Sequence, residues 1–246
     1  MTHIDSIPPT SLATTSYFFD LDGTLANIEK LPKQVAIPKN IIQALCQLSD
    51  VTNGAMALIS GRPIAELDTL SAPLHGPVSG IHGAERRDAN NVLHRKILPK
   101  SLSALISKEL NQTITAFSDC YVENKGMAFA LHYRQDERSK AHILAFAQHF
   151  IKRYPQLVLQ PGKCIVELKP AGVDKGTAIR TFMHEAPFAG RTPLFIGDDL
   201  TDEAGFQQVN ALQGISIKVG SGSTIARYHL EDVSQVHQWL KELAKQ

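Results

Sequence analysis

The chain has 246 residues, of which 43% are hydrophobic, enough to bury one large core or a core plus a smaller inserted one. This composition argues against a fibrous or disordered protein. Its 25 basic and 24 acidic residues give a net charge of +1, so no global field attracts nucleic acid or an anionic membrane surface. Any anion must therefore bind locally.

The sequence shows no sign of export or membrane insertion. Residues 1–5 lack the charged and apolar segments of a secretory signal, and no 18 apolar residues run together. Cys46, Cys120 and Cys164 are odd in number and have no CxxC spacing, which argues against disulfide or metal roles. We expect a monomer in a reducing cytoplasm that binds a small molecule and neither nucleic acid nor membrane.

After a loose arm over residues 1–16, the first chemically informative stretch is Tyr17-Phe18-Phe19-Asp20-Leu21-Asp22-Gly23-Thr24-Leu25. The aromatic run predicts a buried strand, and the carboxylates after it predict a reactive loop at the strand's carboxyl end. Asp20 and Asp22 repel one another unless a cation or a proton intervenes, which favours a divalent metal, a nucleophile and a proton carrier. The alternative is an Asp-Gly turn that closes a surface hairpin.

The next elements alternate between helix and strand. Residues 28–37, interrupted by Pro32, should be loop, and Pro38 should open a helix with an apolar face. A strand over 55–59 and a helix from Pro63 follow. This order predicts a parallel sheet with right-handed crossovers.

From residue 85 to about 169 the pattern changes. Residues 86–91 are polar and turn-like, and a helix should follow around Leu102–Leu110. Two β-rich runs within 119–134 pivot at Asn124-Lys125-Gly126, a helix is expected over 137–154, and Pro161-Gly162 should turn a second hairpin. The segment therefore predicts a compact α+β insertion.

Past Pro170 the alternation resumes, with helices expected over 175–184, from 203 and over 232–244, and strands over 193–196 and 215–219. The predicted fold class is α/β: a doubly wound, Rossmann-like parallel-sheet core formed by residues 1–84 and 170–246. The inserted α+β domain would comprise residues 85–169.

Four separated motifs resemble those of the haloacid dehalogenase (HAD)-like phosphatases. Asp20-Leu21-Asp22-Gly23-Thr24-Leu25 resembles the first motif, Ser60 the second, Lys175 the third and Gly197-Asp198-Asp199 the fourth. Five further stretches are similar to the bacterial trehalose-6-phosphate phosphatase family: 60–63, 80–86, 123–126, 132–134 and 166–170. The resemblance runs from about Tyr17 to Trp239, and it implies that the insertion is a cap covering the active site.

The resemblance also implies roles for the core residues. Asp20 would be the nucleophile that forms an aspartyl-phosphate, Asp22 the proton carrier, and Ser60 and Lys175 the groups that hold phosphate oxygens. Mg²⁺ would bind the carboxylates of Asp20 and Asp198 and the main-chain carbonyl of Asp22, with Asp199 as a further ligand and Asp202 left open.

Two plainer interpretations remain beside these roles. Four acidic residues within 198–203 also fit a helix start favoured by the macrodipole, an explanation that we keep for Asp202. A lysine at a helix start, as at Lys175, opposes the macrodipole, so its charge should serve another purpose unless it is simply solvated.

The resemblance implies that Glu123, Lys125 and Glu167 in the insertion bind the distal glucose, because carboxylates accept paired hydrogen bonds from vicinal hydroxyls. Taken alone, Glu123 and Lys125 also fit the solvated charges of a hairpin. The remaining candidates for substrate binding are Gly61, whose backbone can approach the anion, Arg62, His82 and, in the insertion, Arg134.

The expected function is Mg²⁺-dependent hydrolysis of trehalose 6-phosphate, the last step of trehalose biosynthesis. A phosphatase for sucrose phosphate or mannosylglycerate phosphate is the alternative with the same chemistry. A non-catalytic sugar-phosphate sensor is the alternative from another class, but binding alone does not require the nucleophile Asp20.

Overall fold

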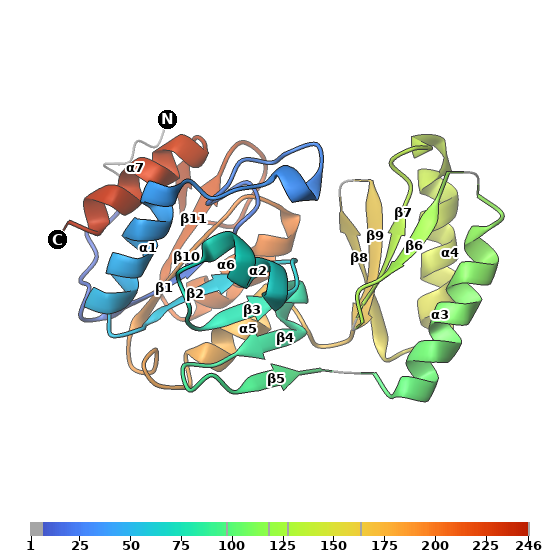
Figure 1. Cartoon of the computed structure of the whole chain (residues 1–246), viewed down its shortest axis with the longest axis horizontal. Coiled ribbons are helices and arrows are strands. Elements are labelled where there is room, and N and C mark those ends of the chain that lie inside the picture. Colours follow the sequence, from blue (N-terminus) through green and yellow to red (C-terminus); the bar gives the residue numbers. More distant parts are fainter. Residues whose placement is uncertain (1–6, 97, 118, 127, 163, 246) are drawn as a thin grey trace. The chain divides into compact units, whose positions relative to one another are not determined.

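A computed structural model describes residues 7–245 except 97, 118, 127 and 163 (Figure 1). The chain forms two compact units. One consists of the residues up to His94 together with those from Asp174 onward, and the other is Arg95–Val173. Below, these are called the core unit and the inserted unit.

The core unit is built on one mixed sheet. Its described strands lie in the order β12-β11-β10-β1-β2-β3-β4-β5, with parallel pairing from β12 to β3 and antiparallel pairing of β3 with β4. The strands are β1 (Thr15–Phe19), β2 (Met56–Ile59), β3 (Val78–Gly80), β4 (Glu85–Arg87), β5 (Leu93–Arg95), β10 (Thr192–Gly197), β11 (Ile215–Val219) and β12 (Tyr228–Leu230).

Helices cover both faces of this sheet. On β1, Tyr17 and Phe19 pack into one apolar cluster with residues of α1 (Lys39–Val51), α2 (Ile64–Ser71) and α7 (Val233–Leu243). Phe18 points to the opposite face, where it packs with α5 (Lys175–Phe182) and α6 (Glu203–Ala211). The uninterrupted apolar run of β1 is thus explained by burial on both faces, as expected for a doubly wound sheet.

The position of β1 in the sheet locates the site. The chain leaves β1 through α1 to β2 on one side, and β10 pairs with β1 on the other side. The strand order reverses at this point, where ligands of open α/β sheets bind outside the carboxyl ends of the strands. Asp20 directly follows β1 and Asp198 directly follows β10, so the sheet brings them together.

The inserted unit is an antiparallel sheet with helices on one face. Its strands lie in the order β6-β7-β9-β8, and the apolar cluster of this unit combines residues from β7 and β9 with residues from both helices. The elements are α3 (Lys100–Ile114), β6 (Tyr121–Asn124), β7 (Phe129–His132), α4 (Lys140–Arg153), β8 (Leu157–Gly162) and β9 (Ile165–Pro170).

The structure differs from the sequence analysis at the start of the insertion. The polar residues 85–87 form β4, and β5 extends the same core sheet after a turn held by Asp88, whose side chain accepts the N–H groups of Asn90 and Val92. The units therefore divide at residues 94/95 and 173/174, whereas 84/85 and 169/170 were expected. Arg86 and Arg87 fit a strand because their guanidinium groups pair with Glu185 and Asp68.

Two short strands, β3 and β12, were also not predicted from the sequence. The expected loose arm lies partly outside the described residues. Within the described part, Ile7 joins the core cluster and Thr10 accepts a hydrogen bond from the hydroxyl of Tyr17 at 2.9 Å, so this portion is not loose. Among the helices in the described ranges, none is both long and apolar enough to cross a membrane.

Candidate active site

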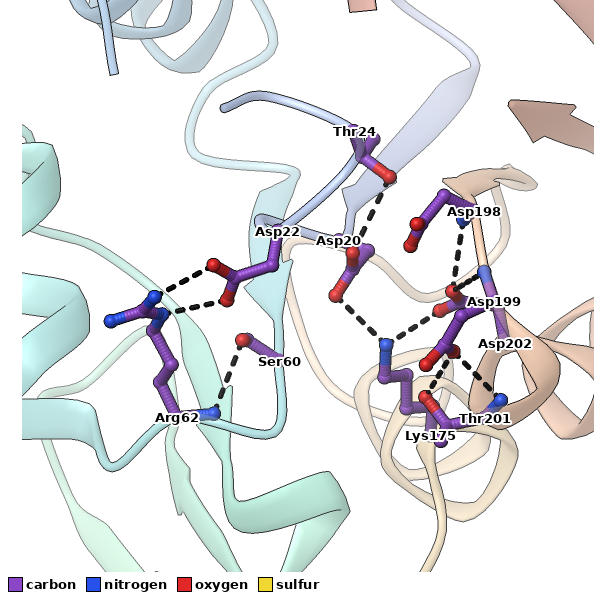
Figure 2. A network of polar contacts seen from close by, with 10 residues as sticks. All are labelled: Asp20, Asp22, Thr24, Ser60, Arg62, Lys175, Asp198, Asp199, Thr201 and Asp202. Atoms are coloured by element: carbon purple, nitrogen blue, oxygen red, sulfur yellow. Dashed lines mark hydrogen bonds and ion pairs between the residues drawn. The ribbon is translucent and has the colours of Figure 1, made fainter. Parts of the chain in front are cut away.

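Asp20 lies at the centre of a buried ionic network (Figure 2). Its Oδ1 accepts a hydrogen bond from Nζ of Lys175 at 2.8 Å, and its Oδ2 accepts one from the hydroxyl of Thr24 at 3.3 Å. The side chain is 3% exposed, and its own N–H is bound by the carbonyl of Ile196 on β10. The carboxylate is therefore fixed at the carboxyl end of β1.

Lys175 connects Asp20 to a second carboxylate. It begins α5, which Asp174 caps by accepting the N–H of Thr177, and its ammonium donates to both Asp20 and Asp202, to the latter at 2.6 Å. Burial alone would lower the pKa of Lys175, but the negative charges of Asp20 and Asp202 raise it above its usual value. The explanation that this lysine is solvated is wrong.

Asp202 is completely buried and organises the turn after β10. While its Oδ1 binds Lys175, its Oδ2 accepts the main-chain N–H groups of Asp198 and Asp199, both at 3.0 Å. Asp199 and Asp202 also form the reciprocal capping box of a short 3₁₀ turn, Leu200–Asp202. The helix-start explanation for Asp202 is thus correct as far as it goes, but it omits the bond to Lys175.

Three described carboxylates are close enough to share one cation: Asp20, Asp198 and Asp202 have oxygens within 4.8 Å of one another. Asp199 lies outside this group, and its Oδ1 accepts hydrogen bonds from the N–H and the hydroxyl of Thr201. Only glycine fits at position 23, where φ is +84° and an added Cβ would lie 2.0 Å from Oδ2 of Asp198. Hard carboxylate oxygens gathered in this way suit a divalent cation.

The protonation of this group reflects its crowding. Burial raises the pKa of Asp20 well above its ordinary range, against the opposing effect of Lys175. Burial, together with the charges of Asp202 and Asp199, raises the pKa of Asp198 to about 7. A cation at these carboxylates would favour their charged forms.

Asp22 points to a different partner. Nε and Nη2 of Arg62 donate to its two carboxylate oxygens at 2.6 and 2.7 Å, and Nη1 of Arg62 donates to Glu66 at 3.1 Å. The N–H of Arg62 also donates to the hydroxyl of Ser60 at 3.2 Å, so the end of β2 is tied to the loop after β1. Figure 2 shows Asp22 and Asp20 on one loop with their side chains held by different cations.

His82 lies against Gly61. A Cβ on Gly61 would come within 2.5 Å of the imidazole, so glycine is required for this close approach. Ile81 and His82 both have left-handed backbones, with φ of 47° and 50°, a costly conformation for a β-branched residue. The N–H groups of Ile81 and His82 hold this turn by donating to the carbonyls of Arg62 and Ser60.

The inserted unit gathers its three candidates on the sheet face opposite its helices. Glu123, Ala130 and Glu167 are neighbours across β6, β7 and β9, so both carboxylates point to the same face. Lys125 donates to Glu167 at 2.6 Å, and Glu123 pairs with the ring of His132 at 2.8 Å. Glu167 is only 6% exposed, so it is not an ordinary solvated charge.

The structure thus groups the predicted residues into two sets, one in each unit. The core unit brings together Asp20, Asp22, Ser60, Gly61, Arg62, His82, Lys175, Asp198 and Asp199, and the inserted unit brings together Glu123, Lys125 and Glu167. Sequence reasoning quoted Thr24 and His132 within motifs but gave neither a role. The structure places the hydroxyl of Thr24 on Asp20 and the ring of His132 on Glu123.

A comparison with protein families matches residues 18–234 to the trehalose-phosphatase family model, which is most of the chain. The chain belongs to the trehalose-phosphatase family. As a member, it is a phosphatase, and the predicted family and fold class are confirmed.

Two bacterial relatives support this membership. The trehalose-6-phosphate phosphatase of Escherichia coli strain K12 is 50% identical over 233 residues, which cover 95% of this chain and 88% of the relative. A probable trehalose-phosphate phosphatase of Sinorhizobium fredii is 37% identical over 212 residues, 86% of this chain and 80% of the relative.

Solved structures show the same fold. The C-terminal domain of the Candida albicans trehalose-6-phosphate phosphatase has a TM-score of 0.77 at 22% identity, covering 95% of this chain and 92% of that one. A phosphatase of the haloalkanoate (HAD) enzyme superfamily from Bacteroides thetaiotaomicron has a TM-score of 0.64 at 16% identity, covering 97% of each chain. The trehalose-phosphatase family therefore shares its architecture with the wider HAD group.

Proposed function

We propose that this phosphatase hydrolyses trehalose 6-phosphate to trehalose and phosphate, depends on Mg²⁺ and acts through a phosphorylated Asp20. The observation that carries the proposal is the network of the buried Asp20, Lys175 and Asp202, to which the main-chain N–H of the partly buried Asp198 is bonded. A binding protein has no need to bury two carboxylates and one ammonium at this cost. The likeness to the E. coli enzyme supports the choice of substrate.

In the first step, an oxygen of Asp20 attacks phosphorus and the bond to the sugar oxygen breaks, leaving an aspartyl-phosphate. Asp22 donates a proton to the departing sugar oxygen and then accepts one from the water that hydrolyses the intermediate. Because Arg62 binds both oxygens of Asp22 in this structure, proton transfer requires at least one of these hydrogen bonds to break.

Charge neutralisation is the main demand of phosphoryl transfer. Lys175 and the hydroxyl of Ser60 supply donors for phosphate oxygens, and the backbone at Gly61 can approach the anion. Asp20, Asp198 and the carbonyl of Asp22 would hold Mg²⁺, whereas Asp199, expected as a further ligand, lies outside the group of neighbouring carboxylates. When bound, the cation would neutralise charge on the transferred group.

The other end of the substrate is a glucose, which presents vicinal hydroxyls. We assign it to Glu123, Lys125 and Glu167, whose charged groups share one face of the inserted sheet. In this proposal the inserted unit is the specificity cap. A cytoplasmic location and a monomeric state remain predictions from the sequence.

Truncation of Glu167 to Ala should act selectively on the disaccharide substrate. Losing one or two charged hydrogen bonds, each worth roughly 1.5–3 kcal/mol, should lower kcat/KM for trehalose 6-phosphate about ten- to several-hundred-fold. A small aryl phosphate lacks the distal glucose, so its turnover should barely change. Phosphate release on both substrates measures the difference.

Glu109→Ala is a matched control, since Glu109 pairs with Arg153 between the helices of the same unit. This variant should treat both substrates alike. Equal losses on both substrates in Glu167→Ala would assign Glu167 to the stability of the fold, and no loss on either would remove it from the site.

Mg²⁺ binding should depend on pH through Asp198. Its pKa of about 7, against an ordinary 3.8, means that between these pH values the folded, cation-free protein holds a proton that the unfolded chain does not. The free energy of unfolding in chelator should therefore fall as pH rises through this window. A cation competes with that proton, so its apparent Kd should be about tenfold higher at pH 6 than at pH 8.

Thermal denaturation with chelator and with graded Mg²⁺, at both pH values, measures these effects. Asp198→Asn removes one titrating group and should lessen the decline of stability in chelator, while Asp20 and Asp202, whose pKa values burial also raises, keep the rest of it. Full turnover in chelator, or Mg²⁺ stabilisation that is equal at pH 6 and pH 8, would contradict the assignment of the cation to Asp198.

The assay that tests the proposed function as a whole is phosphate release from a panel of sugar phosphates. Trehalose 6-phosphate should give the highest kcat/KM. A higher kcat/KM for sucrose phosphate or mannosylglycerate phosphate would assign that compound as the substrate instead. Binding of a sugar phosphate without turnover would identify the protein as a sensor.

A further inference from the structure

Lys218 is a buried charge that the proposed chemistry does not use. It lies on β11, where the sequence Ile215-Ser216-Ile217-Lys218-Val219 alternates between apolar and polar residues, a pattern typical of a strand with one solvated face. The structure instead leaves Lys218 only 5% exposed. Such a burial is costly for an ammonium unless specific partners surround it.

Its partners are main-chain carbonyls at the site. Lys218 pairs with Gly197 in the register of β10 and β11, directly before Asp198. Its Nζ donates to the carbonyl oxygen of Asp198 and, at 2.7 Å, to that of Val219. The positive charge of Lys218 also acts on the carboxylate of Asp198.

Asp198 is therefore held at both of its peptide groups. Its N–H donates to Oδ2 of Asp202 at 3.0 Å, and its carbonyl accepts from Lys218. The carboxylate of Asp198 packs so closely against Gly23 that a Cβ on residue 23 would not fit between them. With its backbone fixed at both ends, Asp198 retains little freedom except rotation of its own side chain.

We propose that Lys218 is a positioning residue for the cation site, which fixes the backbone of Asp198 and thereby aims its carboxylate at the ion. This inference rests on the metal site proposed above. Residues that orient metal ligands typically change metal affinity 10- to 100-fold when they are replaced.

The direction of the change in metal affinity distinguishes a positioning role of Lys218 from an effect of its charge alone. A positive charge beside a cation site repels the ion, so removing it without any other change should tighten metal binding. Removing the hydrogen bond from Lys218 to the carbonyl of Asp198 should weaken metal binding. Lys218→Met deletes both the charge and the donors while keeping an apolar side chain of similar length.

The experiment measures Mn²⁺ binding by electron paramagnetic resonance of the free ion, without substrate. We expect Lys218→Met to raise the Kd for Mn²⁺ about 10- to 100-fold, and Lys218→Arg, which keeps charge and donors, to stay within a few-fold of wild type. Arg86→Met is the matched control, because Arg86 is a buried cation of the same unit that binds Glu185 and lies over Phe182. It should lower the melting temperature and leave the Kd unchanged.

Mn²⁺ binding by Lys218→Met that is as tight as wild type, or tighter, would overturn the proposal. If Lys218→Met does not fold, Lys218→Gln, which loses the charge and shortens the donor arm by one atom, is judged by the same criterion. Absence of Mn²⁺ binding by the wild-type protein would overturn the metal site itself and this inference with it. Binding by wild type without phosphatase activity would reject the proposed function and leave the role of Lys218 intact.

Discussion

Asp20→Asn should reduce phosphate release from trehalose 6-phosphate by more than about a thousandfold, a loss of over ~4 kcal/mol of transition-state stabilisation. The change is nearly isosteric and removes the negative charge that attacks phosphorus. Lys175 keeps Asp202 as a partner at 2.6 Å, so the fold should persist. The measurement is the steady-state rate together with the melting temperature of the same sample.

The matched control is Asp68→Asn, which neutralises a carboxylate of the same unit that pairs with Arg87. It should alter stability and leave kcat near the wild-type value. A variant Asp20→Asn that keeps more than about a thousandth of wild-type turnover would make water a better candidate nucleophile than Asp20.

Lys175→Met should be the most damaging change to stability. It leaves Asp20 and Asp202 buried without their cation, and breaking a buried pair in this way costs about 3–5 kcal/mol. Turnover should be lost as well, because a donor to the phosphate disappears. Urea denaturation in chelator measures the stability, and added Mg²⁺ should restore part of it by neutralising Asp20.

A second substitution separates the two losses. Adding Asp202→Asn to Lys175→Met removes one buried anion, so the double variant should recover much of the free energy of unfolding without recovering activity. If Lys175→Met alone is as stable as wild type in chelator, the ammonium does not balance these carboxylates and the network has been misinterpreted.

The parts of the fold that followed from the sequence are those with a strong local cause. The apolar run before Asp20 predicted a strand buried on both faces, and carboxylates at strand ends predicted that Asp20 and Asp198 would meet. The helices of the inserted unit followed from apolar periodicity. In each case neighbouring residues carried the signal.

The parts that did not follow depend on partners distant in sequence. Arg86 and Arg87 looked like a polar turn because their partners, Glu185 and Asp68, are not adjacent to them. Lys218 was not singled out, because nothing near it in sequence reveals the carbonyl of Asp198. Arg62 was expected at substrate, and its bidentate bond to Asp22 spans 40 positions. Tertiary contacts of this kind leave no local pattern.

The interruption of the core unit between His94 and Asp174 has a consequence for synthesis on the ribosome. β1 is made early, but one of its two neighbours, β10, is made only after the whole inserted unit. Until then an apolar strand has an unpaired edge, the kind of surface that promotes aggregation. The same delay keeps Asp20 without its partner Lys175. The nascent chain therefore passes through a long interval in which its active site is incomplete. Slow elongation over residues 95–173 should therefore prolong the stage at which the nascent chain depends on chaperones.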